Sequence, residues 1–132
     1  MNKLHFTHFT LLTAAVVLLL SSFIAADAVL TKNGKTTVVN TTTLTTNVRG
    51  FKGTTPVKIY IKGHKIQKIE AFPNKETPKF FAVAKKVLAK FEGKSVNKVA
   101  TMDVDAKTGA TFSTKALIAN VKQGVKYYKE HK

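Results

Sequence analysis

The sequence predicts an α+β fold, in which a small antiparallel sheet is covered by helices and forms a single domain after a signal peptide. Two short runs after residue 56 alternate apolar with polar residues, as strands with one buried face do. Two later stretches repeat apolar residues at every third or fourth position, as amphipathic helices do. Strands followed by a helix, a further strand and a second helix are typical of a small α+β sandwich.

The first 28 residues have the features of a secretory signal peptide. Lys3 supplies positive charge, an apolar run extends over 11–25, and small residues that suit cleavage follow up to Ala28. This run is shorter than the roughly 20 apolar residues that cross a bilayer. We therefore predict a signal peptide at 1–28, cleaved after Ala26 or Ala28, with an uncleaved membrane anchor as the alternative.

The segment that follows is rich in threonine, which suits strands and also occurs in extended linkers. We interpret residues 29–43 as a flexible lead-in to a folded domain at 44–132. Within that domain, residues 44–49 are expected to form an edge strand. The glycines of "RGFKG", Gly50 and Gly53, mark a bend or a close approach of the backbone.

A two-stranded hairpin is predicted next. Val57, Ile59 and Ile61 alternate with polar residues, and a second run with Ile66 and Ile69 follows "KGHK". One face of this hairpin is apolar and the other bears lysines.

The first helix is expected to begin at Thr77, a good N-cap, with Pro78 at the first helical position. Gly93 is expected to end it. Residues 96–105 are predicted to form a further strand, and a second helix is predicted from about Ser113 to Lys129. The apolar stripes are Phe80, Ala84, Val87, Leu88 and Phe91 on the first helix and Leu117, Val121, Val125 and Tyr128 on the second.

The chain is strongly basic, with 22 Lys and Arg against 7 Asp and Glu and a net charge of +15. Such a charge favours an anionic partner or surface. The alternative is that the charge serves solubility, because the lysines are spread along the chain. There is no cysteine, which excludes disulfides and a lipid-modified cysteine.

No conventional catalytic or metal-binding set is visible. Two of the four histidines lie in the leader, and the other two, His64 and His131, lack the spacing of metal ligands. No pair of carboxylates indicates general acid–base chemistry. The sequence therefore argues against a hydrolase and predicts neither catalytic residues nor a metal site.

The turn "DAKTG" places a hydroxyl at the entrance of the second helix. Gly109 allows a sharp turn or close contact with a ligand. Thr111 then stands where free N–H groups and the helix dipole favour a phosphate, so its hydroxyl could carry a phosphoester. No His or Lys is poised to activate that hydroxyl, so another enzyme would have to do so. The alternative is an ordinary β-turn, with Thr111 or Ser113 as a helix cap.

The stretch "VDAKTGATFSTKALIANV" resembles the C-terminal motif of the FMN-binding domain family, which includes flavin-carrying subunits of the sodium-pumping NADH:quinone reductase and of the Rnf complex. In the family the Thr after Gly-Ala carries FMN through a phosphoester, and a separate flavin transferase installs it from FAD with magnesium. The resemblance assigns covalent FMN to Thr111. The matching motif residues are Asp105, Thr108, Gly109, Ala110, Thr111 and Ser113.

A second segment, residues 50–78, is similar to the family's glycine bend, strand hairpin and Glu-Thr-Pro motif. In the family this segment abuts the flavin ring, so the resemblance makes Glu76, Thr77 and Phe80 candidate contacts. The family usually has Gly after that Pro, whereas this chain has Lys79. The resemblance spans Gly50 to about Val125.

Together with the predicted signal peptide, the resemblance predicts a secreted, extracytoplasmic flavoprotein that relays electrons and has no substrate of its own. Its expected partners are the FMN transferase and a membrane reductase or other redox partner, without nucleic acid. The alternative is a basic secreted binding module without cofactor, which either binds an anionic polymer or is PepSY-like, because "MDVDAKTG" also resembles PepSY domains. In those domains the turn leads into a strand, whereas the helical periodicity after Gly109 favours the flavoprotein.

Overall fold

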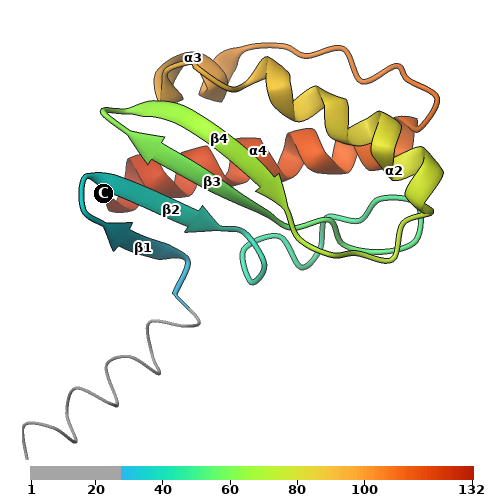
Figure 1. Cartoon of the computed structure of the whole chain (residues 1–132), viewed down its shortest axis with the longest axis horizontal. Coiled ribbons are helices and arrows are strands. Elements are labelled where there is room, and N and C mark those ends of the chain that lie inside the picture. Colours follow the sequence, from blue (N-terminus) through green and yellow to red (C-terminus); the bar gives the residue numbers. More distant parts are fainter. Residues whose placement is uncertain (1–27) are drawn as a thin grey trace, which may run out of the picture.

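The computed structural model describes residues 28–132, so the predicted signal peptide lies outside the described residues apart from Ala28. A four-stranded antiparallel sheet has the order β1-β2-β3-β4 (Figure 1). The strands are β1 (Leu30–Asn33), β2 (Thr36–Asn40), β3 (Val57–Lys62) and β4 (Lys65–Ala71). The helices are α2 (Pro78–Ala84), the 3-10 helix η1 (Lys85–Lys90), α3 (Val96–Thr101) and α4 (Thr111–His131).

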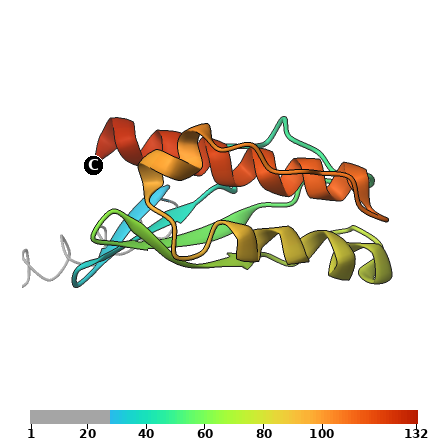
Figure 2. The same ribbon diagram turned by 90° about the horizontal axis from the view of Figure 1, so that it is seen from above.

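The helices pack on one face of the sheet. Viewed from above (Figure 2), α4 runs along the length of the molecule beside α2 and η1, which it contacts. The core forms where the apolar faces of these elements meet, and it contains the alternating residues of β3, namely Val57, Ile59 and Ile61. The fold class is confirmed as a small antiparallel sheet with helices in a single α+β domain.

The long helix α4 lies very close to the sheet at Gly124. A Cβ built on Gly124 would come within 2.6 Å of the Ile59 side chain and 3.0 Å of the Thr41 methyl group. A larger residue would therefore push α4 away from β2 and β3.

A buried polar network joins α4 to the chain after β2. Asn120, on α4, is fully buried, and its Oδ1 accepts hydrogen bonds from Thr41 at 2.7 Å and Thr45 at 2.5 Å. Thr41 Oγ1 also accepts from the backbone N–H of Val57 at 2.9 Å. Buried polar groups that all have partners specify one arrangement of the core, so this network fixes the Thr-rich segment against α4.

The interpretation of residues 29–43 as a flexible lead-in is wrong, because this segment contains β1 and β2. Leu30 pairs with Val39, and Val39 pairs with Ile59 of the central hairpin. The sequence shows no clear alternation here because Val39 is the one buried residue of β2, and it follows Thr36, Thr37 and the half-buried Val38. The edge strand expected at 44–49 is also wrong, since Leu44 and Thr45 instead turn back and donate their N–H groups to the Thr41 carbonyl.

The strand predicted at 96–105 is wrong as well, because its first half is the helix α3. Ser95 accepts a hydrogen bond from the backbone N–H of Lys98, which is an N-cap contact, and Val96 and Val99 are buried three residues apart. The chain before α3 instead borders the sheet: Gly93 and Lys94 exchange backbone hydrogen bonds with Ile66 of β4. The outer edge of β4 is thereby protected.

The two predicted helices are confirmed with shifted ends. Thr77 is the N-cap of α2 and Pro78 is its first helical residue, although the Thr77 side chain makes no capping hydrogen bond. The first helix changes to 3-10 geometry at Lys85, and Gly93 follows its end with a φ of +80°. The second helix starts at Thr111, two residues earlier than predicted.

Candidate functional site

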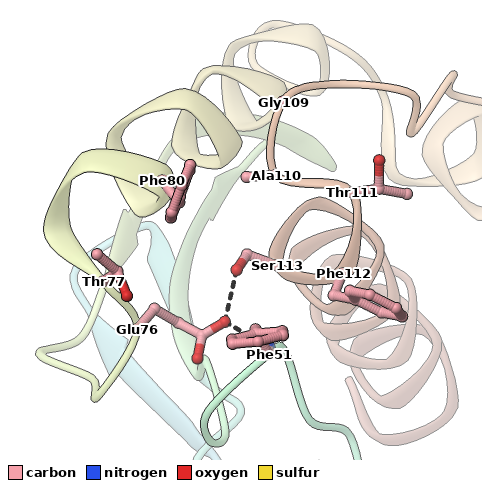
Figure 3. Close-up of a pocket in the computed structure, with 9 residues that line it drawn as sticks. All are labelled: Phe51, Glu76, Thr77, Phe80, Gly109, Ala110, Thr111, Phe112 and Ser113. Atoms are coloured by element: carbon pink, nitrogen blue, oxygen red, sulfur yellow. Dashed lines mark hydrogen bonds between the residues drawn. The ribbon is translucent and has the colours of Figure 1, made fainter.

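Three loops that are distant in the sequence meet at the N-terminal end of α4 and enclose a cavity of about 320 Å³ (Figure 3). They are the glycine bend 50–53, the segment before α2 and the turn that leads into α4. The size of the cavity lies within the range typical of ligand pockets. The lining residues are Phe51, Glu76, Thr77, Phe80, Gly109, Ala110, Thr111, Phe112 and Ser113.

Glu76 joins the three loops. Its carboxylate accepts hydrogen bonds from the successive backbone N–H groups of Phe51 at 2.7 Å, Lys52 at 2.6 Å and Gly53 at 3.1 Å. The Ser113 hydroxyl donates to the same carboxylate at 2.5 Å. Successive N–H groups of this kind form a small anion-binding concavity, which here binds a carboxylate of the protein itself. Both Glu76 oxygens are therefore engaged in holding the loops together.

The environment of Glu76 keeps it ionised. The side chain is only 5% exposed, and desolvation by burial on its own would raise its pKa. The hydrogen bonds from Ser113 and from the bend outweigh this effect and hold the pKa of Glu76 below its ordinary value. The site therefore contains a buried negative charge at neutral pH, and no basic side chain pairs with it among the described residues.

Gly50 is required by the same contact. A Cβ at this position would lie 2.2 Å from Glu76 Oε1 and 3.4 Å from Ser113 Cα. The sequence indicated a bend or a close approach at "RGFKG", and the structure shows a close approach of the backbone to the Glu76 carboxylate.

The cavity has an exposed aromatic rim. Within residues 28–132, the exposed large apolar side chains are Phe51, Phe80 and Phe112, with 72%, 50% and 66% of their surfaces accessible. All three line this cavity. The rings of Phe51 and Phe112 lie 6.2 Å apart, and Figure 3 shows Phe80 on the opposite side of the opening. Exposed apolar side chains gathered at one concave place mark a binding surface.

Thr111 is the first residue of α4 and lies half-buried at the edge of the cavity. Its hydroxyl donates to the Thr108 carbonyl at 3.0 Å. No side chain caps the N-terminus of α4, because the N-cap residue is Ala110. This end of the helix is therefore suited to accept a phosphate group.

Seven of the nine predicted site residues line the cavity, whereas Asp105 and Thr108 do not. Asp105 accepts a hydrogen bond from the N–H of Lys107, and Thr108 Oγ1 accepts one from the N–H of Ala110. These two side chains shape the turn that presents Thr111. Lys79, which departs from the family's glycine, is exposed on α2 and does not line the cavity.

Sequence reasoning missed Phe51 and Phe112 as site residues. Phe51 stands between the two glycines of the bend, and Phe112 stands between Thr111 and Ser113. Each therefore adjoins a motif, but a phenylalanine in a basic chain is expected in the core. Its exposure was not visible without the structure.

The fold and the cavity define a small α+β domain with a ligand site at one end. The chain belongs to the FMN-binding domain family, whose model matches residues 50–126 and so spans every lining residue of the cavity. It is therefore a flavin-binding protein with FMN as its cofactor. A comparison with curated proteins finds no match.

The residues of the cavity fit FMN. The aromatic rim suits a flat ring system, and the uncapped start of α4 suits a phosphate. Within the described residues, no three His, Cys, Asp or Glu side chains gather to hold a metal ion. None of the helices between residues 28 and 132 is long and apolar enough to cross a membrane.

Proposed function

We propose that this protein is an extracytoplasmic flavoprotein that carries FMN covalently on Thr111 and relays electrons. The bound flavin supplies the redox chemistry, and the chain supplies attachment, orientation and the electrostatic environment. The observation that carries the proposal is the position of the Thr111 hydroxyl, at the uncapped start of α4 and on the rim of an aromatic cavity.

The hydrogen bonds of the turn distinguish Thr111 from its neighbours. Thr114 is fully buried and donates to the Ala110 carbonyl, and Ser113 is buried and donates to Glu76. Thr108 Oγ1 is shared between Ala110 N–H and the Thr114 hydroxyl. Thr111 is not buried and its hydroxyl makes one hydrogen bond, to the Thr108 carbonyl, so its oxygen is less engaged than that of Thr108 and less buried than those of Ser113 and Thr114.

Among residues 28–132, no side chain that could act as a base is hydrogen-bonded to this hydroxyl. The Thr111 hydroxyl contacts a backbone carbonyl, which cannot take up its proton. Formation of the phosphoester thus needs a base from a separate transferase, which agrees with the expected FMN transferase as a partner.

The proposed ring position favours electron relay. A flavin tethered at Thr111 can place its ring against the aromatic rim, where Phe51 and Phe112 remain largely exposed in the protein. An electron donor or acceptor, such as a membrane reductase, can then approach the ring from solvent. No substrate pocket separate from this rim is needed.

Covalent attachment is tested by intact mass after co-expression with a flavin transferase. The unmodified sequence should gain the mass of FMN less one water on a peptide that contains Thr111, and Thr111→Ala should abolish the gain. Thr111→Ser and Thr108→Ala should both retain modified protein, because each keeps a hydroxyl at position 111. The change to alanine should cost at most about 1 kcal/mol of stability, so a folded but unmodified variant is expected.

Flavin on Thr111→Ala would refute the acceptor, and an unmodified wild-type protein beside an active transferase would refute covalent attachment. In the second case the basic binding module becomes the better reading.

Export is proposed from the leader. Protein recovered outside the cytoplasm should begin at Asp27 or Val29, because the small residues before these positions suit cleavage. N-terminal sequencing that finds Met1 on the exported protein would favour a membrane anchor.

A further inference from the structure

A second concavity, of about 440 Å³, lies between α3 and the C-terminal half of α4, and we infer that it binds a linear phosphate-bearing polymer. We call it the lysine groove. Its lining residues are Ala100, Lys122, Gln123, Lys126, Lys129 and Glu130.

The three lysines of the groove form one row. They occur at spacings of four and three residues on α4, so each stands about one turn, or roughly 5 Å, beyond the last. Like charges at such spacings destabilise a helix by a few tenths of a kcal/mol per pair. The negative end of the helix dipole compensates Lys129 in the last turn, but it does not account for Lys122 and Lys126 further inside.

The positive charge of the groove is largely uncompensated by acidic side chains. Within residues 28–132, the structure contains one salt bridge, between Lys68 and Glu70, and it lies on the sheet. Glu130 is the one acidic residue of the lining, against three lysines. The groove thus keeps a net positive charge inside a concave surface, where fields of one sign are strengthened.

One of these charges is held in place. Lys122 is half-buried, and its Nζ donates a hydrogen bond to the Met102 carbonyl after α3. Two further N–H donors remain on the same ammonium group. A charge fixed in this way loses less side-chain entropy when it binds an anion than a free lysine does.

The lining favours phosphate over a protein partner or a nucleobase. A lysine ammonium binds phosphate as a point charge without a required orientation. The groove contains no Trp, Tyr or Arg, the residues that dominate protein interfaces, and no aromatic ring on which a base could stack. A row of lysines along a groove matches the regularly spaced charges of a linear polymer better than it matches the flat surface of a bilayer.

The lysine groove is separate from the flavin cavity. Thr111 begins α4, whereas the groove lysines lie 11 to 18 residues further along, about 17–27 Å away along the axis. Figure 1 shows the two ends of α4 at opposite ends of the domain. A polymer in the groove would therefore hold the protein while the aromatic rim stays open.

Binding of long-chain inorganic polyphosphate tests this inference. The wild-type protein is compared with a triple variant, Lys122→Gln, Lys126→Gln and Lys129→Gln. A matched triple variant carries Lys85→Gln, Lys86→Gln and Lys90→Gln, which removes the same charge from exposed lysines of η1 outside the groove. Circular dichroism establishes that both variants are folded.

The groove variant should bind polyphosphate at least tenfold more weakly, and the η1 variant should stay within about twofold of the wild type. The binding should also depend less on salt in the groove variant: the negative slope of log K against log salt should become shallower by about 2, because each of the three lost phosphate contacts contributes about 0.7. Equal losses in both variants would show that net charge alone causes binding and would overturn the groove.

Two further probes test the choice of polymer. Poly-glutamate of equal charge should bind at least tenfold more weakly than polyphosphate, and equal binding through the groove lysines would overturn the preference for phosphate. Co-sedimentation of the protein with phosphatidylglycerol vesicles should fall no more in the groove variant than in the η1 variant. Groove-dependent sedimentation without polyphosphate binding would assign the groove to a lipid surface instead.

Discussion

Replacing Glu76 by glutamine tests whether one carboxylate holds the cavity together. Glutamine has nearly the same shape, but it offers a single oxygen and presents an NH₂ group in place of the other. Of the four donors on Glu76, two can still bond the remaining oxygen, while the other two would meet the NH₂ group, from which the Ser113 hydroxyl could accept but a backbone N–H could not.

The expected loss of stability is about 2–4 kcal/mol. If each hydrogen bond to the charged carboxylate contributes about 1.5 kcal/mol, the low end of its usual range, and each neutral one about 1 kcal/mol, two lost bonds and two weakened ones cost about 4 kcal/mol, which is the upper limit. Phe51 and Lys52 are exposed, so water can hydrate their N–H groups when the bend opens, which lowers the cost. This loss is a large part of the 5–15 kcal/mol free energy of unfolding of a typical domain.

Urea unfolding at pH 7 measures this difference, with Glu130→Gln as the control because Glu130 is an exposed carboxylate. The pH dependence supplies a second check. The folded pKa of Glu76 lies below its ordinary value of 4.5, so its stabilisation is complete above that value and is lost as the pH falls through the folded pKa. The gap between wild type and variant should therefore narrow in acid.

A Glu76→Gln effect below about 0.5 kcal/mol, the size of an ordinary surface substitution, would refute the assigned role of Glu76. A gap that stays constant down to strongly acidic pH would refute the contribution of its charge.

Two other substitutions test the same structure. Gly50→Ala should destabilise the protein and lower its flavin content, because the new methyl group meets Glu76 Oε1; the effect should be less than additive with Glu76→Gln in a double-mutant cycle, and full additivity would contradict a shared contact. Asn120→Ala should lower the unfolding free energy by about 2–4 kcal/mol, because it removes the buried acceptor of two threonine hydroxyls and leaves a small cavity. Asn97→Ala, at an exposed position of α3, should change it by less than about 0.5 kcal/mol. Equal effects of the two asparagine substitutions would contradict the importance of the buried network.

The central hairpin and the long helix could be predicted because their periodicity is strong. Ile59 and Ile61 alternate strictly with polar residues, and the apolar stripe of α4 continues from Leu117 to Tyr128, which is about three turns. The N-terminal strands could not be predicted in this way. Their threonines are compatible with strand and linker alike, and the partner that selects the strand is β3, about 20 residues further along.

The helix α3 was missed because its signals are local and short. Ser95 is a recognisable N-cap, but Val96 and Val99 also suit a strand, and only contact with α4 decides between the two. Most of the candidate site was found through its motifs rather than through periodicity. Phe51 and Phe112 of the exposed rim could not be predicted, because their exposure depends on how three loops assemble in space.

The hydrogen bonds of Glu76 connect residues that are far apart along the chain. Phe51 lies 25 residues before Glu76, and Ser113 lies 37 residues after it. Contacts of such high sequence separation form only when the chain is largely folded. A short peptide with the sequence "DAKTGATFS" contains the hydroxyl that we propose as the acceptor but does not form the cavity. The cavity beside Thr111 is consequently a property of the completed fold, and an enzyme that required it would modify only finished molecules.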